Sequence, residues 1–186
     1  MSAQMINLGV SLGAMQLARK IPFEDPEVLM YVRIAYVSVQ LVVLGIYYYV
    51  SMKIKEKNDL TVLKYVEPKN PMSPDSGGLV TTTVREYDLQ ETSKALKGVL
   101  MGIGMMAFMH GYLKYTQPLF IQALMGLKGL YDSNEVTIHL LGKKAEGDLK
   151  RPFKQPPGLM GATGPQTDAA AIKEAEAAEK IAKKDE

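Results

Sequence analysis

Polar side chains interrupt two long apolar stretches of this sequence at helical spacing. In the stretch from Val28 to Met52, four of them fall on one face of a helix: Arg33, Tyr36, Gln40 and Tyr47. In the stretch from Gly98 to Leu127, three lie about one turn apart and share a face: His110, Lys114 and Gln117. A charge at mid-bilayer costs about 2.5–3.5 kcal/mol, so such groups face protein or water. They predict a hydrated intramembrane groove that shelters the polar parts of an incoming membrane segment.

Packing and snorkelling are the alternatives for these residues. Arg33 and Lys114 lie a few residues from the ends of their predicted helices, where a long cationic side chain reaches the interface. Gln40 and His110 lie deeper and fit a groove or a packed polar contact equally well. The orientation predicted below also places Arg33 and Lys114 nearer the lumen, whereas a groove that receives segments from the cytosol should open toward the cytosol.

Methionines give the second apolar stretch an adaptable surface. Met101, Met105 and Met109 recur every four residues, and Met106 lies beside them. Methionine is unbranched and suits promiscuous apolar surfaces, so these four residues are candidates for contact with varied transmembrane segments or with another helix. Ordinary lipid-facing or helix-packing positions are the alternative.

A basic segment follows the last apolar stretch. Its cations are Lys143, Lys144, Lys150 and Arg151. They are candidates for contact with the phosphates of ribosomal RNA or of anionic lipid. A solvated basic loop is the alternative.

Patterns typical of an enzyme are absent from the sequence. It has no nucleotide-binding glycine loop, its two histidines lie in unrelated contexts, and it has no cysteine for a disulfide or a thiolate ligand. We therefore expect a non-enzymatic protein with no catalytic residue, no metal site and no cofactor.

The positions of these residues depend on apolar segments long enough for a bilayer. The stretch from Val28 to Met52 has one formal charge and, at about 1.5 Å per residue, crosses a hydrocarbon layer of about 30 Å. It ends in three tyrosines, and lysines at 53, 55 and 57 follow, as is typical of a cytosolic membrane interface. The fold class is therefore an α-helical integral membrane protein.

Two further apolar stretches complete the predicted membrane region. Ala3–Ala18 is short for a span, and whether it crosses fully stays open. A third span runs from Gly98 to about Gln117, where Pro118 breaks the stretch. The second part, Leu119–Tyr131, is more consistent with a re-entrant or interfacial helix. About three transmembrane helices are expected.

The polar segments predict a small α/β element. Thr61–Val66 and Val80–Val84 have the β-branched composition of strands, and Asp88–Lys97 begins a helix. Val136–Leu140 is a third strand candidate. The remaining predictions are a loop over Pro68–Gly78, a linker over Gln155–Gly164 and a solvated helix over Asp168–Lys184 with Asp168 as its N-cap.

The domain organisation and orientation follow from these elements. A membrane region covers residues 1–131 and is interrupted by the segment 53–97. A basic segment with a short strand covers 132–154, and a flexible linker with an Ala/Glu/Lys-rich tail covers 155–186. Segment 53–97 has eight lysines and arginines and the connector 19–27 has two, so 53–97 is predicted to be cytosolic. The basic tail favours the same side, which requires an even number of crossings in between.

Blocks spread in order over residues 24–154 carry a resemblance to a known family. They include Glu24-Asp25-Pro26, Met30-Tyr31-Val32-Arg33-Ile34, Lys57-Asn58-Asp59-Leu60-Thr61, Lys64-Tyr65-Val66-Glu67-Pro68, Thr82-Thr83-Val84-Arg85-Glu86-Tyr87-Asp88-Leu89, Phe108-Met109-His110, Tyr112-Leu113-Lys114-Tyr115-Thr116, Pro118-Leu119-Phe120, Asn134-Glu135-Val136, Ile138-His139-Leu140 and Gly147-Asp148-Leu149-Lys150-Arg151-Pro152-Phe153-Lys154. They resemble the fungal inorganic phosphate transport protein family, also described as the membrane component of the SRP-independent targeting (SND) pathway. The first helix and the tail match less closely.

This resemblance implies a multi-pass protein of the endoplasmic reticulum (ER) membrane. It would act with the Sec translocon and other SND components in targeting or inserting client transmembrane segments, in contact with lipid and with the ribosome as a further partner. With the predicted groove, the chain would be an insertase. Two alternatives stay open. The first is a phosphate transporter or an accessory factor for phosphate transport, and the second is a structural adaptor of the translocon.

Overall fold

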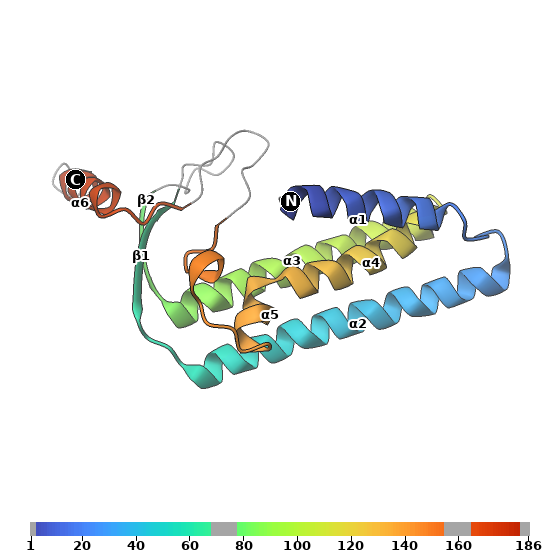
Figure 1. Cartoon of the computed structure of the whole chain (residues 1–186), viewed down its shortest axis with the longest axis horizontal. Helices are drawn as coiled ribbons and strands as arrows, with labels where there is room; N and C mark the ends of the chain where they lie inside the picture. The colour runs from blue at the N-terminus through green and yellow to red at the C-terminus, as the bar shows by residue number, and fades with distance from the viewer. Residues whose placement is uncertain (1–2, 68–77, 155–164, 183–186) are drawn as a thin grey trace. The chain divides into compact units, whose positions relative to one another are not determined.

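The computed structural model describes residues 3–67, 78–154 and 165–182 (Figure 1). The chain forms two compact units. We call Met1–Met52 with Thr92–Thr137 the helical unit, and Lys53–Glu91 with Ile138–Glu186 the α/β unit. Most of the predicted loop over Pro68–Gly78 and the whole predicted linker over Gln155–Gly164 fall outside the described residues.

The first two predicted helices are confirmed. Helix α1 covers Ala3–Ala18, and α2 covers Pro26–Lys57 and includes the whole apolar stretch. Proline is well tolerated in the first turn of a helix, and the Asp25 carboxylate accepts a hydrogen bond from the Glu27 backbone N–H at 2.9 Å. Lys55 and Lys57 lie in the last turn of α2, where cations interact favourably with the helix dipole.

Helix α2 is the described helix that is long and apolar enough to cross a membrane. Its most apolar window has a mean hydropathy of 1.8, and only 17% of that window is buried within the structure. Leu41, in the middle of the helix, has 65% of its surface exposed. A core helix of a soluble protein would be buried, so lipid or another apolar surface must cover this side of α2.

The third apolar stretch is two helices with a turn between them. Helix α3 covers Val84–Gly111 and α4 covers Gln117–Asp132. Pro118 lies in the first turn of α4, where its missing N–H costs nothing. The chain therefore turns before the proline, with Lys114 in the left-handed conformation (φ 60°) and the Tyr115 N–H donating to the Met109 carbonyl at 3.0 Å.

Because of this turn, the prediction of about three transmembrane helices is not confirmed. The apolar part of α3, from Gly98 to Gly111, spans about 21 Å at 1.5 Å per residue, and α4 about 24 Å. Both are shorter than a hydrocarbon layer of about 30 Å.

Side chains from all four helices hold the helical unit together. Helix α1 packs on α4, with Ala14 and Ala18 buried on its inner face. Tyr36 of α2, Met106 of α3 and Leu119 of α4 form a buried cluster that joins the other three helices.

The two predicted strands are confirmed in the α/β unit. Strands β1 (Val62–Glu67) and β2 (Gly78–Thr83) pair antiparallel, with Val62 opposite Thr83 and Glu67 opposite Gly78. The buried residues Tyr65, Tyr87, Ile138 and Phe153 form the core beside them. The Tyr87 ring makes edge contacts with Tyr65 and Phe153, and the Phe153 N–H donates to the Tyr87 hydroxyl at 2.8 Å. This core ties the first half of the unit to residues that follow the last apolar helix.

The predicted third strand is wrong. Residues Asn134–His139 form the short helix α5, and a 3₁₀ turn, η1, follows at Gly147–Leu149. Ser133 starts α5, because its carbonyl accepts from the Thr137 N–H at 3.0 Å and its hydroxyl from the Val136 N–H at 3.4 Å. This start and the burial of Val136 and Ile138 outweigh the strand preference of a β-branched run.

The tail helix is confirmed, but it is not fully solvated. Helix α6 covers Ala169–Ala182, and the Asp168 carbonyl accepts the first helical hydrogen bond from Ile172 at 3.0 Å, which makes Asp168 the N-cap. The helix packs on both strands. Its half-buried Ile172 and an ion pair of 3.1 Å between Lys64 and Glu176 account for the contact.

Candidate functional site

An open hollow lies between α2, α3 and α4 of the helical unit, and we call it the polar cavity after the amides of Gln40 and Gln122, which interrupt its otherwise mostly apolar wall. Its volume is about 360 Å³, and glycines at 98, 126 and 129 leave space in its wall. The Gln40 side chain lines it and is only 7% exposed. No described residue forms a hydrogen bond with the Gln40 amide. The amide is not among the fully enclosed polar atoms that lack a partner, so it is open to the cavity, where water or another molecule can form hydrogen bonds with it.

Gln122 of α4 is a second amide on the wall of the polar cavity. Its Oε1 accepts a hydrogen bond from the Tyr36 hydroxyl at 3.2 Å. Its Nε2 faces Gly102, where an added Cβ would lie only 2.7 Å away, so α3 admits this amide because it has glycine there. The sequence interpretation missed Gln122. The sequence signal that could have identified Gln122 is an amide within a mostly apolar helix, the same signal that identified Gln40.

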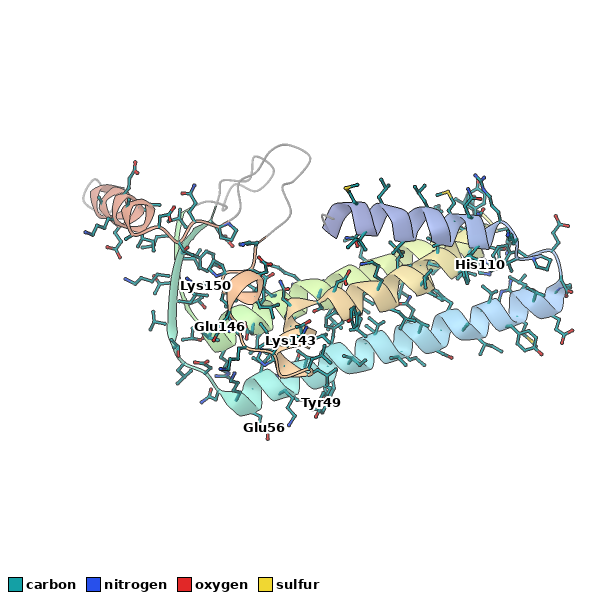
Figure 2. All side chains as sticks on the ribbon, viewed as in Figure 1. Tyr49, Glu56, His110, Lys143, Glu146 and Lys150 are labelled. Atoms are coloured by element: carbon teal, nitrogen blue, oxygen red, sulfur yellow. The ribbon has the colours of Figure 1, made fainter. Side chains whose placement is uncertain are left out.

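Arg33 and His110 meet near the turn between α3 and α4. The Arg33 Nε donates to His110 Nε2 at 2.9 Å, and His110 Nδ1 lies 3.0 Å from the Tyr115 carbonyl. Since Nε2 accepts and Nδ1 donates, the ring is neutral in this arrangement. Figure 2 labels His110 at this end of α3. The structure thus brings together two of the predicted groove residues.

The other two predicted groove residues lie apart from this pair. Lys114 is exposed in the turn, and Gln117 is the first residue of α4. The prediction that His110, Lys114 and Gln117 share one helical face is wrong, because α3 ends at Gly111.

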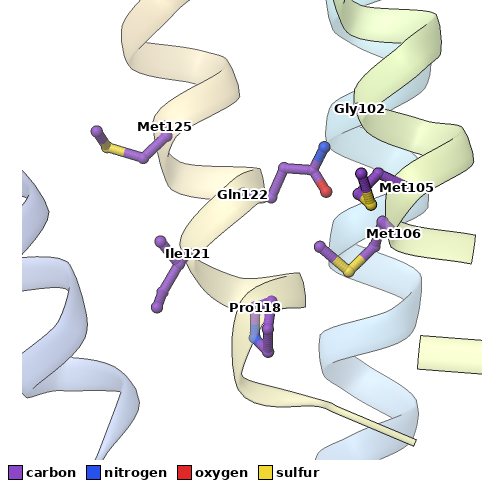
Figure 3. Close-up of a pocket in the computed structure, with 7 residues that line it drawn as sticks. All are labelled: Gly102, Met105, Met106, Pro118, Ile121, Gln122 and Met125. Carbon is purple, nitrogen blue, oxygen red and sulfur yellow. The ribbon is translucent and has the colours of Figure 1, made fainter. Parts of the chain in front are cut away.

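The predicted methionine surface is also divided. Met105 and Met106 line a groove of about 340 Å³ between α3 and α4, together with Gly102, Pro118, Ile121, Gln122 and Met125 (Figure 3). We call it the methionine groove. Met101 does not line it and is 77% exposed, and Met109 is half-buried elsewhere on α3. Met106 is 5% exposed and belongs to the buried cluster.

Three of the four predicted basic residues are exposed in the α/β unit. Figure 2 shows Lys143 and Lys150 on the segment that follows α5, with Glu146 between them in sequence, and Lys144 is exposed as well. Arg151 differs from these lysines because its side chain is only 11% exposed. Its guanidinium is occupied by Asp88, so the phosphate-binding hypothesis rests on the three lysines.

Asp88 forms a buried cluster with Arg151 and His139. Its side chain is 1% exposed, and Arg151 donates from Nε to Oδ1 at 2.5 Å and from Nη2 to Oδ2 at 2.6 Å. His139 Nε2 lies 2.7 Å from Oδ2. Burial by itself would raise the pKa of Asp88, but hydrogen bonds from His139 and Arg151 and the Arg151 charge lower it below its usual range.

The sequence interpretation missed this cluster. Asp88, His139 and Arg151 lie in three of the sequence blocks quoted above, but no local spacing connects them. Their contact places the first turns of α3, the end of α5 and the segment after α5 in one folded unit.

The fold and the sites together define the class of protein to which this chain belongs. The chain is mostly helical, with polar groups in its helical unit and a small α/β unit, and within residues 3–67, 78–154 and 165–182 one helix is long and apolar enough to span a membrane. The protein belongs to the Pho88 family, because the family profile described as "Phosphate transport (Pho88)" matches residues 1–183.

Fungal relatives match nearly the whole chain. SRP-independent targeting protein 3 of Saccharomyces cerevisiae is 51% identical over 180 residues, which cover 96% of this chain and 96% of the relative. The SRP-independent targeting protein 3 homolog of Schizosaccharomyces pombe is 43% identical over 93% of this chain and 90% of the relative. The uncharacterized protein C589.06c of the same yeast is 45% identical over 92% and 85%. No solved structure matches the chain.

Proposed function

We propose that the chain is a non-enzymatic ER membrane factor for SRP-independent targeting that inserts client transmembrane segments. Two relatives are named for SRP-independent targeting, which supports the pathway. The polar cavity supports the activity, because it offers hydrogen bonds among apolar helices. Polar residues of a client segment would use these hydrogen bonds while they cross the hydrocarbon layer.

The unpaired Gln40 amide carries this proposal. A helix that only packs against its neighbours gains nothing from an amide that faces a hollow without a protein partner, since leucine would add apolar contact there. Here the amide lines a cavity large enough for several water molecules, each of which takes about 30 Å³ in the liquid. Gln122 adds a second amide on the same wall. The predicted groove therefore becomes a polar cavity with Gln40 and Gln122 at its centre and Arg33 with His110 near the α3–α4 turn.

A re-entrant hairpin is the membrane arrangement that fits the two short helices. The Asp88–Arg151 ion pair requires the first turns of α3 and the segment after α5 to lie on the same side of the membrane. The apolar part of α3 and the whole of α4 then enter the membrane and return, with the turn at Lys114 deep or on the far side. Lysines after Met52 favour the cytosolic side for both segments. Helices this short thin the bilayer around them, which lowers the barrier for a polar flank.

Contacts with the ribosome, the client and partner proteins complete the proposal. The exposed lysines at 143, 144 and 150 would meet ribosomal RNA phosphates, and the exposed Met101 on α3 would contact apolar client segments. The Sec translocon and other SND components are the proposed partners that deliver or accept the client.

Phosphate transport is the second candidate, because the family description names it. The polar cavity favours it less, since its polar lining consists of neutral groups and the Nε of Arg33 is held by His110. A translocon adaptor would need neither an unpaired amide nor a cavity.

A single reconstitution separates the three candidates. Protein in liposomes is assayed for insertion of a test transmembrane protein with a polar flank and for phosphate flux. We expect insertion without flux, and a loss of insertion of about tenfold in Gln40→Leu with Gln122→Leu, as for one or two hydrogen bonds. Gln16→Leu is the matched control, because Gln16 is exposed on α1. Flux that the purified protein supports alone would favour transport, and wild-type insertion by the double variant would remove the cavity from the mechanism.

A further inference from the structure

A second hollow lies in the helical unit where α1 ends and α4 begins. It has a volume of about 210 Å³ and is lined by Met15, Arg19, Gln117, Pro118 and Ile121. Arg19 follows directly after α1, and its guanidinium has no ion-pair partner in the part of the chain that the structure describes. The apolar wall of this hollow therefore lies beside an arginine that has no ion-pair partner among the described residues.

This hollow continues into the methionine groove. Pro118 and Ile121 line both, so the two share a wall along α4. Figure 3 shows Pro118, Ile121 and Met125 following one another along α4, with Met105 and Met106 opposite on α3. The path from Gln117 to Met125 is about 12 Å long at 1.5 Å per residue. The path begins beside the Arg19 cation and becomes apolar toward Met125. An amphiphile, with one charged end and one apolar end, matches this arrangement.

We propose that the two hollows bind one glycerophospholipid. Its phosphate lies at the Arg19 guanidinium, and one acyl chain follows Ile121 and Met125 into the methionine groove. The guanidinium fork matches phosphate oxygens in charge and geometry. The proposal rests on the prediction that the apolar helix α1 belongs to the membrane region, since Arg19 follows this helix and would then lie at headgroup level.

The size of the groove favours an acyl chain over a client helix. One turn of a helix, about 10 Å across and 5.4 Å long, fills roughly 400 Å³. The methionine groove holds about 340 Å³, less than that single turn but enough for the first part of one acyl chain, whose remainder would continue into the bilayer. Free inorganic phosphate would use Arg19 but would gain nothing from Met15, Pro118 and Ile121.

Native mass spectrometry of the full chain tests the proposal. Protein purified in a mild detergent is titrated with phosphatidylcholine, and the fraction that retains one lipid is measured. Arg19→Gln should weaken retention about tenfold, as for one charge-assisted hydrogen bond. Ile121→Trp should abolish it by filling both hollows while it leaves the cation in place. Lys20→Gln is the matched control, because it removes the adjacent charge from a side chain that lines neither hollow, and it should retain the lipid as the wild type does.

Three outcomes would overturn the proposal. Equal losses of lipid retention in Arg19→Gln and Lys20→Gln would mean that surface charge alone holds the lipid. Wild-type retention in Ile121→Trp would mean that the acyl chain does not bind in these hollows. Displacement of the lipid by millimolar phosphate would assign Arg19 to the free anion. A photoreactive residue at Ile121 in native membranes identifies the occupant, since a lipid adduct supports the proposal and a peptide adduct assigns the groove to a client. Insertion by the Gln40 variants is measured separately, so failure of either proposal is distinguishable from failure of the other.

Discussion

Asp88 is the position where a single substitution should most affect the α/β unit. The carboxylate is 1% exposed, and its partners Arg151 and His139 have side chains that are 11% and 5% exposed. Asp88→Ala leaves the Arg151 guanidinium buried without its counter-charge, and breaking a buried pair in this way costs about 3–5 kcal/mol. At about 1.4 kcal/mol per factor of ten, this corresponds to an increase of roughly a hundredfold or more in local opening.

Hydrogen–deuterium exchange of the full chain in detergent micelles measures this opening. Amides of β1 and of the first turns of α3 should exchange about a hundredfold faster in Asp88→Ala, while those in the apolar part of α2 should not change. The matched control is Asp148→Ala, because Asp148 pairs with Lys154 on the surface, where the two side chains are 94% and 77% exposed. Such exposed pairs contribute little, so the control should exchange as the wild type does.

A compensating variant shows whether the buried charge is the cause. Asp88→Leu combined with Arg151→Met removes both charges, and the pair should be less destabilised than Asp88→Leu alone. A rate change of less than about threefold in Asp88→Ala, well below that expected for a broken buried pair, would refute the reasoning, as would an additive double variant. Because the folded pKa of Asp88 is depressed, its stabilisation is fully present above the ordinary value of about 3.9 and is lost as the pH falls through the lower folded pKa.

Three further predictions concern topology, the basic surface and a buried phenol. The sequence has no cysteine, so single cysteines at Glu56 and Lys143 should both react with a membrane-impermeant maleimide in sealed ER vesicles, whereas one at Leu41 should not; labelling of only one of the first two would contradict the same-side arrangement. Reversing the charges at Lys143, Lys144 and Lys150 should reduce co-sedimentation with ribosomes at moderate salt and flatten its salt dependence, and unchanged binding across a salt series would exclude phosphate contact. Burial raises the pKa of Tyr65 to about 12, so Tyr65→Phe should remove the tyrosine absorbance change near that pH and leave those near pH 10 intact. The stabilisation from this neutral phenol is present below about pH 10 and should be lost between pH 10 and 12. If Tyr65→Phe instead removed absorbance change near pH 10, the Tyr65 phenol would not be buried.

Much of the secondary structure was predictable because its signals are local. The bounds of α1 agreed with the sequence prediction, and the two strands agreed closely, because hydropathy and β-branched composition act over a few residues. The end of α3 and the fold of Asn134–His139 were not predicted. A proline marks a break without saying how many residues before it turn, and a short β-branched run is ambiguous until its burial is known.

The candidate site divides in the same way. The sequence alone determined that Arg33, Gln40 and His110 are polar groups in apolar helices, and therefore that they need protein or water around them. Only the tertiary structure decided that Arg33 bonds His110, that Gln40 shares a cavity with Gln122, and that Arg151 pairs with Asp88 instead of serving the basic surface. Residue type and helical period fix which face of a helix is polar. Which partner meets that face depends on the packing of segments far apart in the chain, and no local pattern carries that information.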